Sequence, residues 1–433
     1  MKKEPNLYIG AINPFALTEV LTGRMIDWNK RESVEVIEDT LETEYSELFD
    51  MKYNSPLFAG LRLTDNNTAE PVDNSEISIR GDNDTETPDL SNIKTIGGLK
   101  KAGINITKET KIQSSFLSRG ILNLRLDLPE MDKTLSKTRL SSMMASIVMS
   151  TGSSDEWTPE NCVWKDTGDF FKAITEYTDP IQGAIGNSYF IAALSAVAWA
   201  SPHLIIHRNR ANASVETSRM NVIPFYSKGG KKDAPARKVE VSDKTIFKPS
   251  NNLPVYCRSS DSAEIFPALY EKAFAKWILQ TNSDKPDITK TAYGDPVKAM
   301  AQLNNKTPHY YYTDSRTGDD LYSIVRSNSM SYKTIHPMVA WTYGSNNDYS
   351  GINIVGNHAY SVLGWALKGI KKYFILRNPW GVSEPSGLNT YQGVLTYLDK
   401  SFWMPVTTIE NHGVFAIEAN AFKNLFAGLG VAK

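Results

Sequence analysis

The sequence has 433 residues, enough for two or three domains, and its 41% hydrophobic and 22% charged residues are ordinary for a globular protein. A formal net charge of -1 gives no reason to expect nucleic acid or an anionic membrane as a partner. The two cysteines, Cys162 and Cys257, can form at most one disulfide bond, which excludes a disulfide scaffold and leaves the redox compartment open.

No segment has the pattern of a membrane span or of a secretory signal. The longest apolar run, residues 189–200, is shorter than the roughly 18 residues that a span requires. Glu4, Pro5 and Asn6 follow the basic N-terminus, and no uninterrupted apolar stretch develops before Glu19. Because a signal can be removed from a protein, we assign no compartment.

The first 150 residues or so form a region of their own composition. Residues 31–50 carry eight acidic side chains and one basic one, which is typical of solvated surface. The alternative for this acidic run is a contact with a basic patch elsewhere in the chain. Residues 63–92 are rich in Asn, Asp, Thr, Pro and Ser and predict a loop that a protease could cut.

The rest of this region predicts regular structure and then a linker. Alternation of apolar and polar residues within 104–128 predicts a few strands, and residues 135–149 predict a helix. Ser150 to Asp155 has linker composition. We therefore expect an N-terminal region of residues 1–152, followed by a domain of residues 153–433.

Beyond the linker, the stretch from Gln182 to Trp199 predicts a buried helix. The helix begins near Ser188 and is apolar nearly all round, so it should be enclosed by other elements. The unpaired N–H groups and the positive dipole end of such a helix favour a thiolate or an oxyanion at its first residue. Ser188 is therefore a candidate site residue.

Several further elements follow in chain order. Residues 220–226, 238–247, 338–344 and 373–376 predict strands, and residues 266–277 predict an amphipathic core helix. His203 and His207 would share one face of a helix, but no third ligand accompanies them, so we interpret them as packing or surface residues.

Two short motifs near the C-terminus add a histidine and an asparagine. His358 follows Gly356 and Asn357, and the run from Arg377 to Gly381 reads Arg-Asn-Pro-Trp-Gly. Each motif alone has an ordinary structural explanation. Their order after Gln182 and Ser188, on two strand-like runs 20 residues apart (378 minus 358), is difficult to explain by chance.

These stretches together resemble the calpain family of cysteine proteases over roughly residues 156–430. Gln182, Gly183, Gly186 and Asn187, followed by Ser188 and an aromatic residue, match the family's nucleophile motif except that serine stands in place of its cysteine. The His358 and Asn378 motifs match the family's other two active-site motifs. A further match is the helical run 268–276.

The resemblance implies an α+β, papain-like fold with two lobes. A helical lobe of about residues 156–330 would carry Ser188, and a β lobe of about 331–433 would carry His358 and Asn378. The smaller N-terminal region would precede both.

The resemblance also implies a role for each site residue. His358 would be the base, oriented by the side-chain oxygen of Asn378, and Gln182 with the Ser188 N–H would form the oxyanion hole. Trp380 would shield the contact between His358 and Asn378 from water. The glycines Gly186 and Gly356 would support the site.

The serine at position 188 predicts an inactive or nearly inactive chain, because a hydroxyl is far harder to ionise than a thiol with its pKa of about 8.5. In one explanation, an engineered Cys-to-Ser change stops self-cleavage. In the other, the serine is natural and the protein is a pseudoprotease that binds peptides or proteins. A transglutaminase or another acyltransferase with related geometry is a further alternative.

As a protease, the protein would act on proteins or peptides bound across the cleft, with no cofactor required for the chemistry. The N-terminal region of residues 1–152 would inhibit the site as a propeptide. Calcium is the activator that the resemblance implies, although no EF-hand pattern occurs and its ligands are not assigned.

Overall fold

The computed structural model describes part of the chain. The described residues run from 156 to 433, and ahead of them lie 7, 9–11, 13, 16, 61–63 and 69–71. Gaps in the main range fall at 160, 167, 172–174, 207–208, 211–219, 228–233, 251, 344–348, 350–353, 382–393, 396–402, 404 and 406–411.

Most predictions for the N-terminal region fall outside these residues. They are the acidic run 31–50, the strands within 104–128, the helix 135–149 and the linker 150–155. Strand β1 (Leu61–Leu63) pairs antiparallel with β2 (Ala69–Pro71), so part of the predicted loop 63–92 is strand.

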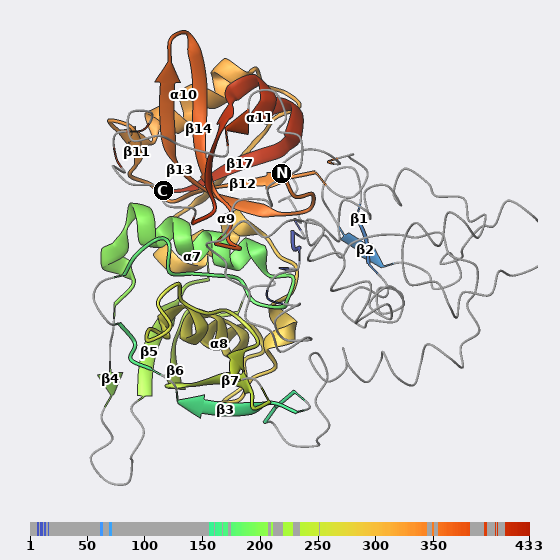
Figure 1. Cartoon of the computed structure of the whole chain (residues 1–433), viewed down its shortest axis with the longest axis vertical. Helices are drawn as coiled ribbons and strands as arrows, with labels where there is room; N and C mark the ends of the chain where they lie inside the picture. Colours follow the sequence, from blue (N-terminus) through green and yellow to red (C-terminus); the bar gives the residue numbers. More distant parts are fainter. Residues whose placement is uncertain are drawn as a thin grey trace, which may run out of the picture.

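The described part of the chain from residue 156 folds into two lobes, and three of its five α-helices precede the strands of its nine-stranded sheet in the chain (Figure 1). The helices are α7 (Ser188–Ala200), α8 (Phe266–Ile278) and α9 (Pro296–Asn304), and two short turns of 3-10 helix are η2 (Pro202–Leu204) and η3 (Ile288–Thr291). The predicted α7 and α8 are confirmed. None of the described helices is long and apolar enough to cross a membrane.

One lobe contains strands as well as helices. One three-stranded sheet has the order β3 (Val163–Asp166), β7 (Lys244–Lys248), β8 (Leu253–Pro254), and the other has β4 (Asn209–Arg210), β5 (Met220–Phe225), β6 (Arg237–Ser242). The predicted single strand 238–247 is therefore wrong, because the chain bends at Asp243 between β6 and β7. The Ser242 N–H donates to the Asp284 carboxylate at that bend.

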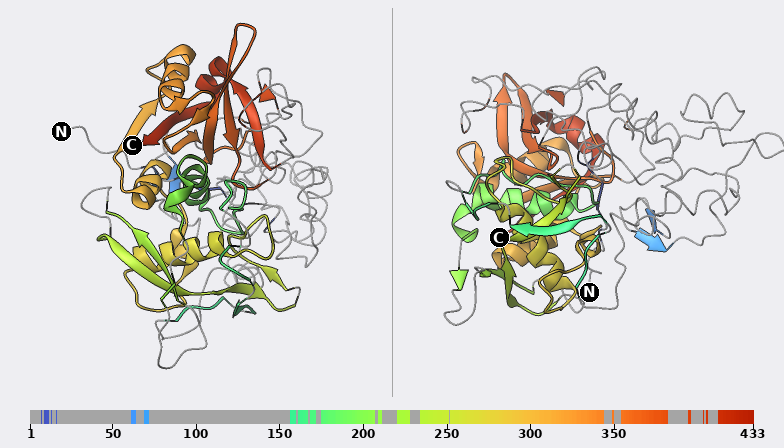
Figure 2. Two further views of the ribbon diagram at one scale, coloured as in Figure 1. Left: turned by 90° about the vertical axis from the view of Figure 1, so that its left-hand side faces the viewer. Right: turned by 60° about the horizontal axis from the view of Figure 1, so that its bottom comes forward.

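The other lobe is a nine-stranded sheet with two helices packed against it (Figure 2). The main order is β15 (Val394–Leu395), β16 (Val414–Glu418), β14 (Lys371–Arg377), β13 (Ala359–Lys368), β12 (Met338–Thr342), β17 (Phe426–Ala432), β9 (Pro308–Tyr312). The remaining strands are β10 (Ser329–Met330) and β11 (Lys333–Thr334), and the helices are α10 (Gly318–Ser327) and α11 (Ala419–Leu425). The expected α+β class is confirmed. Strand β9 joins this sheet although it lies within the range expected for the helical lobe.

Local sequence signals begin and end several of these elements. The Asp295 side chain accepts two N–H groups at the start of α9, and Pro296 occupies the first turn, where a missing N–H costs nothing. Thr317 and Asp320 form a reciprocal capping box at α10. Strands β13 and β14 are joined by a turn at Gly369, whose φ of +62° suits glycine.

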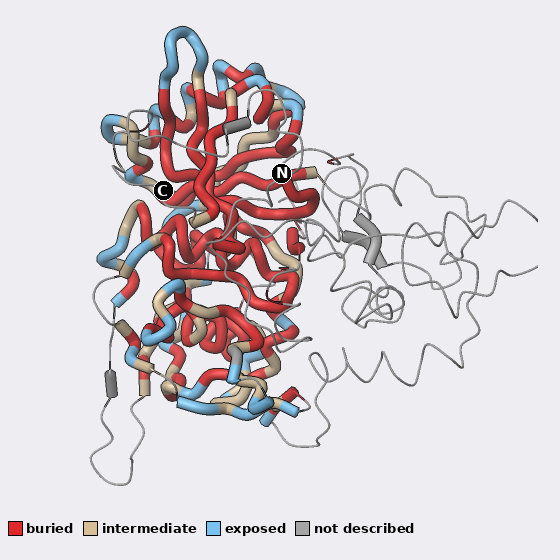
Figure 3. Tube along the Cα trace, in the orientation of Figure 1, coloured by how far each residue is buried: buried red, intermediate tan, exposed pale blue. Residues whose placement is uncertain are grey.

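Helix α7 lies in the middle of the molecule, with the large sheet on one side and α8 on the other, and α9 packs against both α7 and the large sheet (Figures 1 and 3). All but its last residue are buried. The Phe190 ring stacks on Phe274 of α8 at 4.1 Å between centroids. On the sheet side, the Ser361 hydroxyl donates to the Ala192 carbonyl at 2.8 Å. These contacts fix the start of α7 relative to β13.

The stacked pair of Phe190 and Phe274 gives a test of this central packing. Changing Phe274 to Ala leaves a cavity among aromatic rings and should cost about 3–5 kcal/mol of unfolding free energy, measured by urea denaturation. Leu367→Ala is the matched control, because Leu367 of β13 is 49% exposed and should change stability by less than about 0.5 kcal/mol. Equal effects of the two substitutions would contradict the packing described here.

Candidate active site

Ser188 is the first residue of α7 and is fully buried. The loop before it passes so close to residue 256 that a Cβ at Gly183 would lie 2.2 Å from the Tyr256 carbonyl carbon. The Gln182 N–H donates to the Pro379 carbonyl at 2.9 Å, which joins this loop to the loop after β14. The loop and the start of α7 are therefore held beside Asn378.

His358 and Asn378 are neighbours because of strand pairing. In the antiparallel register Ser361 of β13 faces Arg377 of β14, so the residue before β13 and the residue after β14 meet. The His358 Nε2 lies 2.8 Å from the Asn378 Oδ1. Trp380 is fully buried, with its ring centroid 4.9 Å from that of His358, at the place the sequence predicted.

The hydrogen bonds select one tautomer of His358. The Trp380 N–H donates to the Asn378 Oδ1 at 3.1 Å, so this atom is the amide oxygen and can only accept from the imidazole. His358 therefore carries its proton on Nε2, and Nδ1 presents a lone pair. Nδ1 has no hydrogen-bond partner among the described residues. Burial lowers the pKa of His358 to about 3, against the opposite effect of the bond to Asn378, so the ring is neutral at pH 7.

Ser188 is in the same buried cluster but is not bonded to the imidazole. Its hydroxyl oxygen accepts a long hydrogen bond, 3.4 Å, from the N–H of Ala359, the residue after His358. The backbone of His358 is fixed in turn by Thr342, whose hydroxyl accepts the His358 N–H at 2.9 Å. The structure thus brings together Ser188, His358, Asn378 and Trp380.

Gln182 also reaches the site, and its amide is already engaged. Its Nε2 donates to the Ala11 carbonyl at 2.5 Å and to the Ile185 carbonyl at 2.6 Å, while its Oε1 has no partner among the described residues. Ala11 belongs to the N-terminal residues, drawn in dark blue in Figure 1. The predicted inhibitory role of residues 1–152 did not specify this contact, because no motif marks residue 11.

The two glycines expected to support the site differ in what they require. A Cβ at Gly356 would lie 2.9 Å from the Tyr349 ring, so this position has no room for a side chain. At Gly186 the nearest atom is 3.5 Å away, an ordinary contact, and its carbonyl accepts the Tyr293 N–H. Space alone requires glycine at 356 but not at 186.

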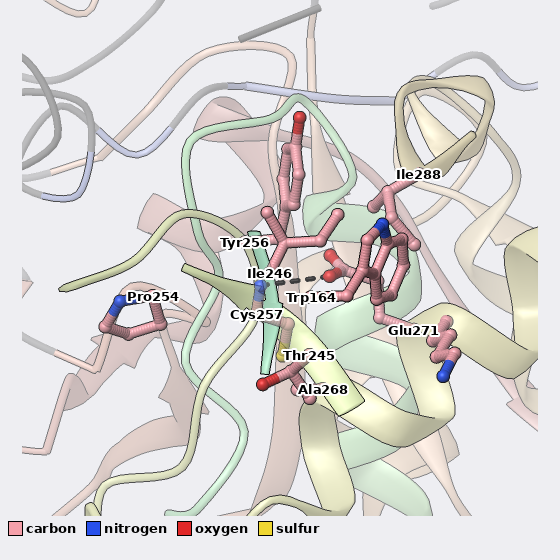
Figure 4. A pocket seen from close by; sticks show the side chains of 10 residues that line it. Trp164, Thr245, Ile246, Pro254, Tyr256, Cys257, Ala268, Glu271 and Ile288 are labelled. Atoms are coloured by element: carbon pink, nitrogen blue, oxygen red, sulfur yellow. Dashed lines mark hydrogen bonds between the residues drawn. The ribbon is translucent and has the colours of Figure 1, made fainter. Parts of the chain in front are cut away.

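A buried carboxylate behind Ser188 was missed as a site residue. Asn187 donates from Nδ2 to the Glu271 Oε1 at 2.6 Å and to the Thr291 hydroxyl at 3.0 Å. The other Glu271 oxygen accepts the Cys257 N–H, in a small pocket also lined by Trp164 (Figure 4). Burial raises the pKa of Glu271 to about 7, and the two N–H donors oppose the rise. The available signal was a charged residue on the apolar face of a predicted core helix.

Arg377 is a second missed residue. It is fully buried and donates to four neutral oxygens, from Nε to the His412 carbonyl and from its two terminal nitrogens to the Pro180 carbonyl, the Ser195 hydroxyl and the Thr178 carbonyl. Burial lowers its pKa to about 10, which still leaves it charged at neutral pH. Arg377 ties the end of β14, directly before Asn378, to α7 and the loop ahead of it.

Within the described ranges, no residue can be assigned to a metal ion. The described residues contain no group of three or more His, Cys, Asp or Glu side chains placed to hold one. Of the histidine pair, His203 is exposed and His207 lies outside the described residues. The two cysteines, Cys162 and Cys257, are both free thiols.

Replacing Arg377 with Lys tests whether this residue holds the end of β14 to α7 and to the loop before it. Lysine keeps the charge but cannot reach four acceptors in the planar geometry, so we expect a loss of about 2 kcal/mol or more in unfolding free energy. Arg326→Lys, at an exposed arginine of α10, is the matched control and should be nearly neutral. Urea denaturation of both variants gives the comparison, and a neutral Arg377→Lys would refute the tie.

The protonation state of His358 can also be tested. Its pKa in the folded protein, about 3, lies below the unfolded value of about 6.5, so its contribution to stability is present above pH 6.5 and is lost as the pH falls. When the pH falls from 6.5 to 5, the free energy of unfolding of the unchanged protein should decrease by about 2 kcal/mol more than that of the His358→Gln variant. The ring nitrogen chemical shifts should report a neutral ring at pH 5, and a charged ring would contradict the assignment.

Comparison with known proteins agrees with this geometry. A family model described as calpain family cysteine protease matches residues 135–433, which is more than half of the chain. A curated relative, a thiol protease of Porphyromonas gingivalis (strain ATCC BAA-308 / W83), is 26% identical, and the alignment covers 96% of this chain and 86% of that protein. The resemblance found in the sequence is thereby confirmed, and the chain belongs to the calpain family of cysteine proteases.

Proposed function

We propose that this protein, with cysteine at position 188, is an endopeptidase that cleaves protein or peptide substrates by a Cys-His-Asn mechanism. The observation that carries the proposal is the tautomer of His358. Its Nε2 proton is bound by Asn378, and the lone pair on Nδ1 has no hydrogen-bond partner among the residues described, beside the N-terminal end of α7.

In the proposed reaction, the Nδ1 lone pair takes the proton of a thiol at position 188. The thiolate, favoured by the helix N-terminus and by the imidazolium, attacks the substrate carbonyl. The Gln182 amide and the residue 188 N–H, one of the first N–H groups of α7 and without an intrahelical acceptor, stabilise the negative oxygen. The imidazolium then protonates the leaving amine, and water hydrolyses the acyl-enzyme with the same base.

The chain with Ser188 is proposed to be inactive or nearly so. The Ser188 hydroxyl accepts from the Ala359 N–H and makes no hydrogen bond to Nδ1, so no proton is positioned for transfer to the base. A hydroxyl needs that transfer during attack, whereas a thiol can ionise beforehand. The engineered Cys-to-Ser change is the preferred origin of the serine because Gln182, His358, Asn378 and Trp380 are all present.

The N-terminal region of residues 1–152 is proposed to act as an inhibitory propeptide, with the catalytic domain following from residue 153. Supporting this idea, the Ala11 carbonyl accepts a hydrogen bond from the Gln182 amide, which the reaction would need. A natural pseudoprotease that binds peptides is the alternative. The same contact favours it, since the binding of a peptide segment to Gln182 needs no nucleophile.

Restoring cysteine tests the proposal. The Ser188→Cys protein should hydrolyse a general protein substrate faster than the chain with serine by a factor on the order of 10³ or more, and N-terminal fragments should appear. Ser188→Ala and the double variant Ser188→Cys with His358→Ala are the controls, and both should remain inactive. Assays with and without added calcium test whether this ion is an activator.

The outcomes separate the two functions. Hydrolysis only in the cysteine form supports the peptidase. A folded Ser188→Cys protein that stays inactive, even after limited proteolysis removes the N-terminal region, would exclude the peptidase and leave the peptide-binding alternative.

A further inference from the structure

A short N-terminal stretch of the chain pairs with the site as an extended peptide. Ile9 and Gly294 exchange both backbone hydrogen bonds, at 2.9 and 3.1 Å, in an antiparallel bridge. The next residue, Gly10, donates its N–H to the Asn357 carbonyl at 3.1 Å. The Ala11 carbonyl then accepts from Gln182. Three successive residues are thus bound through their backbones at the site.

Asn357 binds both polar groups of Gly10. Besides accepting its N–H, Asn357 donates from Nδ2 to the Gly10 carbonyl at 2.8 Å. Asn357 has a φ of +48°, a left-handed conformation that asparagine tolerates better than most residues and that presents its carbonyl and amide together. This residue precedes His358, so recognition of Gly10 occurs directly beside the imidazole.

Gly186, Gly294 and Asn357 form the surface that binds this N-terminal stretch, and we name this surface the groove. It has no room for a side chain at position 10. A Cβ on Gly10 would lie 2.2 Å from the Gly186 carbonyl oxygen and 2.9 Å from the Tyr293 ring. The carbonyl is part of the loop that leads into α7, and it is fixed because it accepts the Tyr293 N–H at 2.8 Å. Neither neighbour can yield without moving this loop, so any residue larger than glycine is disfavoured.

The residues on either side of Gly10 are buried. Leu7 is 3% exposed, Ile9 is fully buried, and Ala11 is 1% exposed. Asn13 donates to the Gln182 carbonyl at 2.6 Å. The stretch is therefore bound at Gly294 through Ile9 and at Gln182 through Asn13. Two buried side-chain oxygens beside this stretch, the Gln182 Oε1 and the Asn357 Oδ1, have no hydrogen-bond partner among the described residues. Unsatisfied polar atoms are rare in a protein core, so they indicate a binding site.

We propose that this groove recognises extended peptides with an apolar residue followed by glycine and a small residue, and that Ile9, Gly10 and Ala11 are its resident ligand and competitive inhibitor. Asn357 and the Gly186 carbonyl are the residues that select glycine. The proposal deepens the proposed function, since it names the substrate class of the same site, but binding itself requires no catalysis.

The test is therefore a binding measurement on the chain with Ser188. The probe is a fluorescent peptide with the sequence of residues 5–14. The unchanged chain should bind it weakly because the resident ligand occupies the groove. Gly10→Val should vacate the groove and increase the affinity for the peptide by about 5- to 150-fold, the equivalent of an overpacking cost of 1–3 kcal/mol. Ile370→Ala, at a 96% exposed side chain, is the matched control and should behave like the unchanged chain.

Two further variants are included. One keeps the test valid if Gly10→Val does not fold, and the other shows which residue selects glycine. Gly10→Ala introduces the smallest side chain that meets the Gly186 carbonyl and should act in the same direction. A peptide with valine in place of glycine should bind the Gly10→Val protein at least about fivefold more weakly than the natural peptide. Asn357→Gly is then added to the Gly10→Val protein. Glycine fits the positive φ but lacks the amide donor, so this double variant should bind the natural peptide severalfold more weakly than Gly10→Val alone.

The results test glycine selection, the resident ligand and the peptidase separately. Equal binding of the glycine and valine peptides would refute glycine selection, and unchanged affinity after both substitutions at Gly10 would refute the resident ligand. Peptide binding with the expected selectivity in a protein whose Ser188→Cys form is inactive would retain this inference and refute the proposed peptidase. Activity without peptide binding would do the reverse.

Discussion

The site depends on the antiparallel pairing of β13 with β14. This register places His358 and Asn378 at adjacent strand ends, and the hydrogen bond between them follows from the backbone. The Trp380 N–H then fixes the amide so that only its oxygen faces the ring. In the proposed reaction, this arrangement determines which imidazole nitrogen carries a lone pair and can accept a proton.

Charged groups buried outside this pair hold the surrounding elements in place. Arg377 connects the end of β14 to α7 through neutral oxygens, and Glu271 connects Asn187 to the loop after β8 through the Cys257 N–H. Lys272, the next residue of α8, is buried too, and it is paired with Asp284 at 3.0 Å. Removing one partner from such an arrangement leaves a buried polar group unsatisfied, so a single substitution at one of these residues is expected to be strongly destabilising.

Much of the fold could be predicted from the sequence where one pattern decides the structure. The apolar surface of α7 and the helical spacing in α8 predicted both helices to within one residue. The motifs around Ser188, His358 and Asn378 predicted which residues meet. The binding of residues 9–11 could not be predicted, because it rests on backbone groups that every sequence has. Arg377 looked like an ordinary charged residue, and the signal for Glu271, a charge on a predicted core helix, did not show which groups surround it.

The two free thiols have a consequence for the reactivity of the chain. Burial raises the pKa of Cys162 to about 11, and it raises that of Cys257 as well, so neither is appreciably a thiolate at neutral pH. The same burial therefore disfavours the thiolate, which is the form of cysteine that reacts with alkylating reagents. A cysteine at the first residue of α7, in contrast, would face an imidazole lone pair at a helix N-terminus. Among the described residues, the fold thus favours a thiolate at the first residue of α7 and at neither of the two native cysteines.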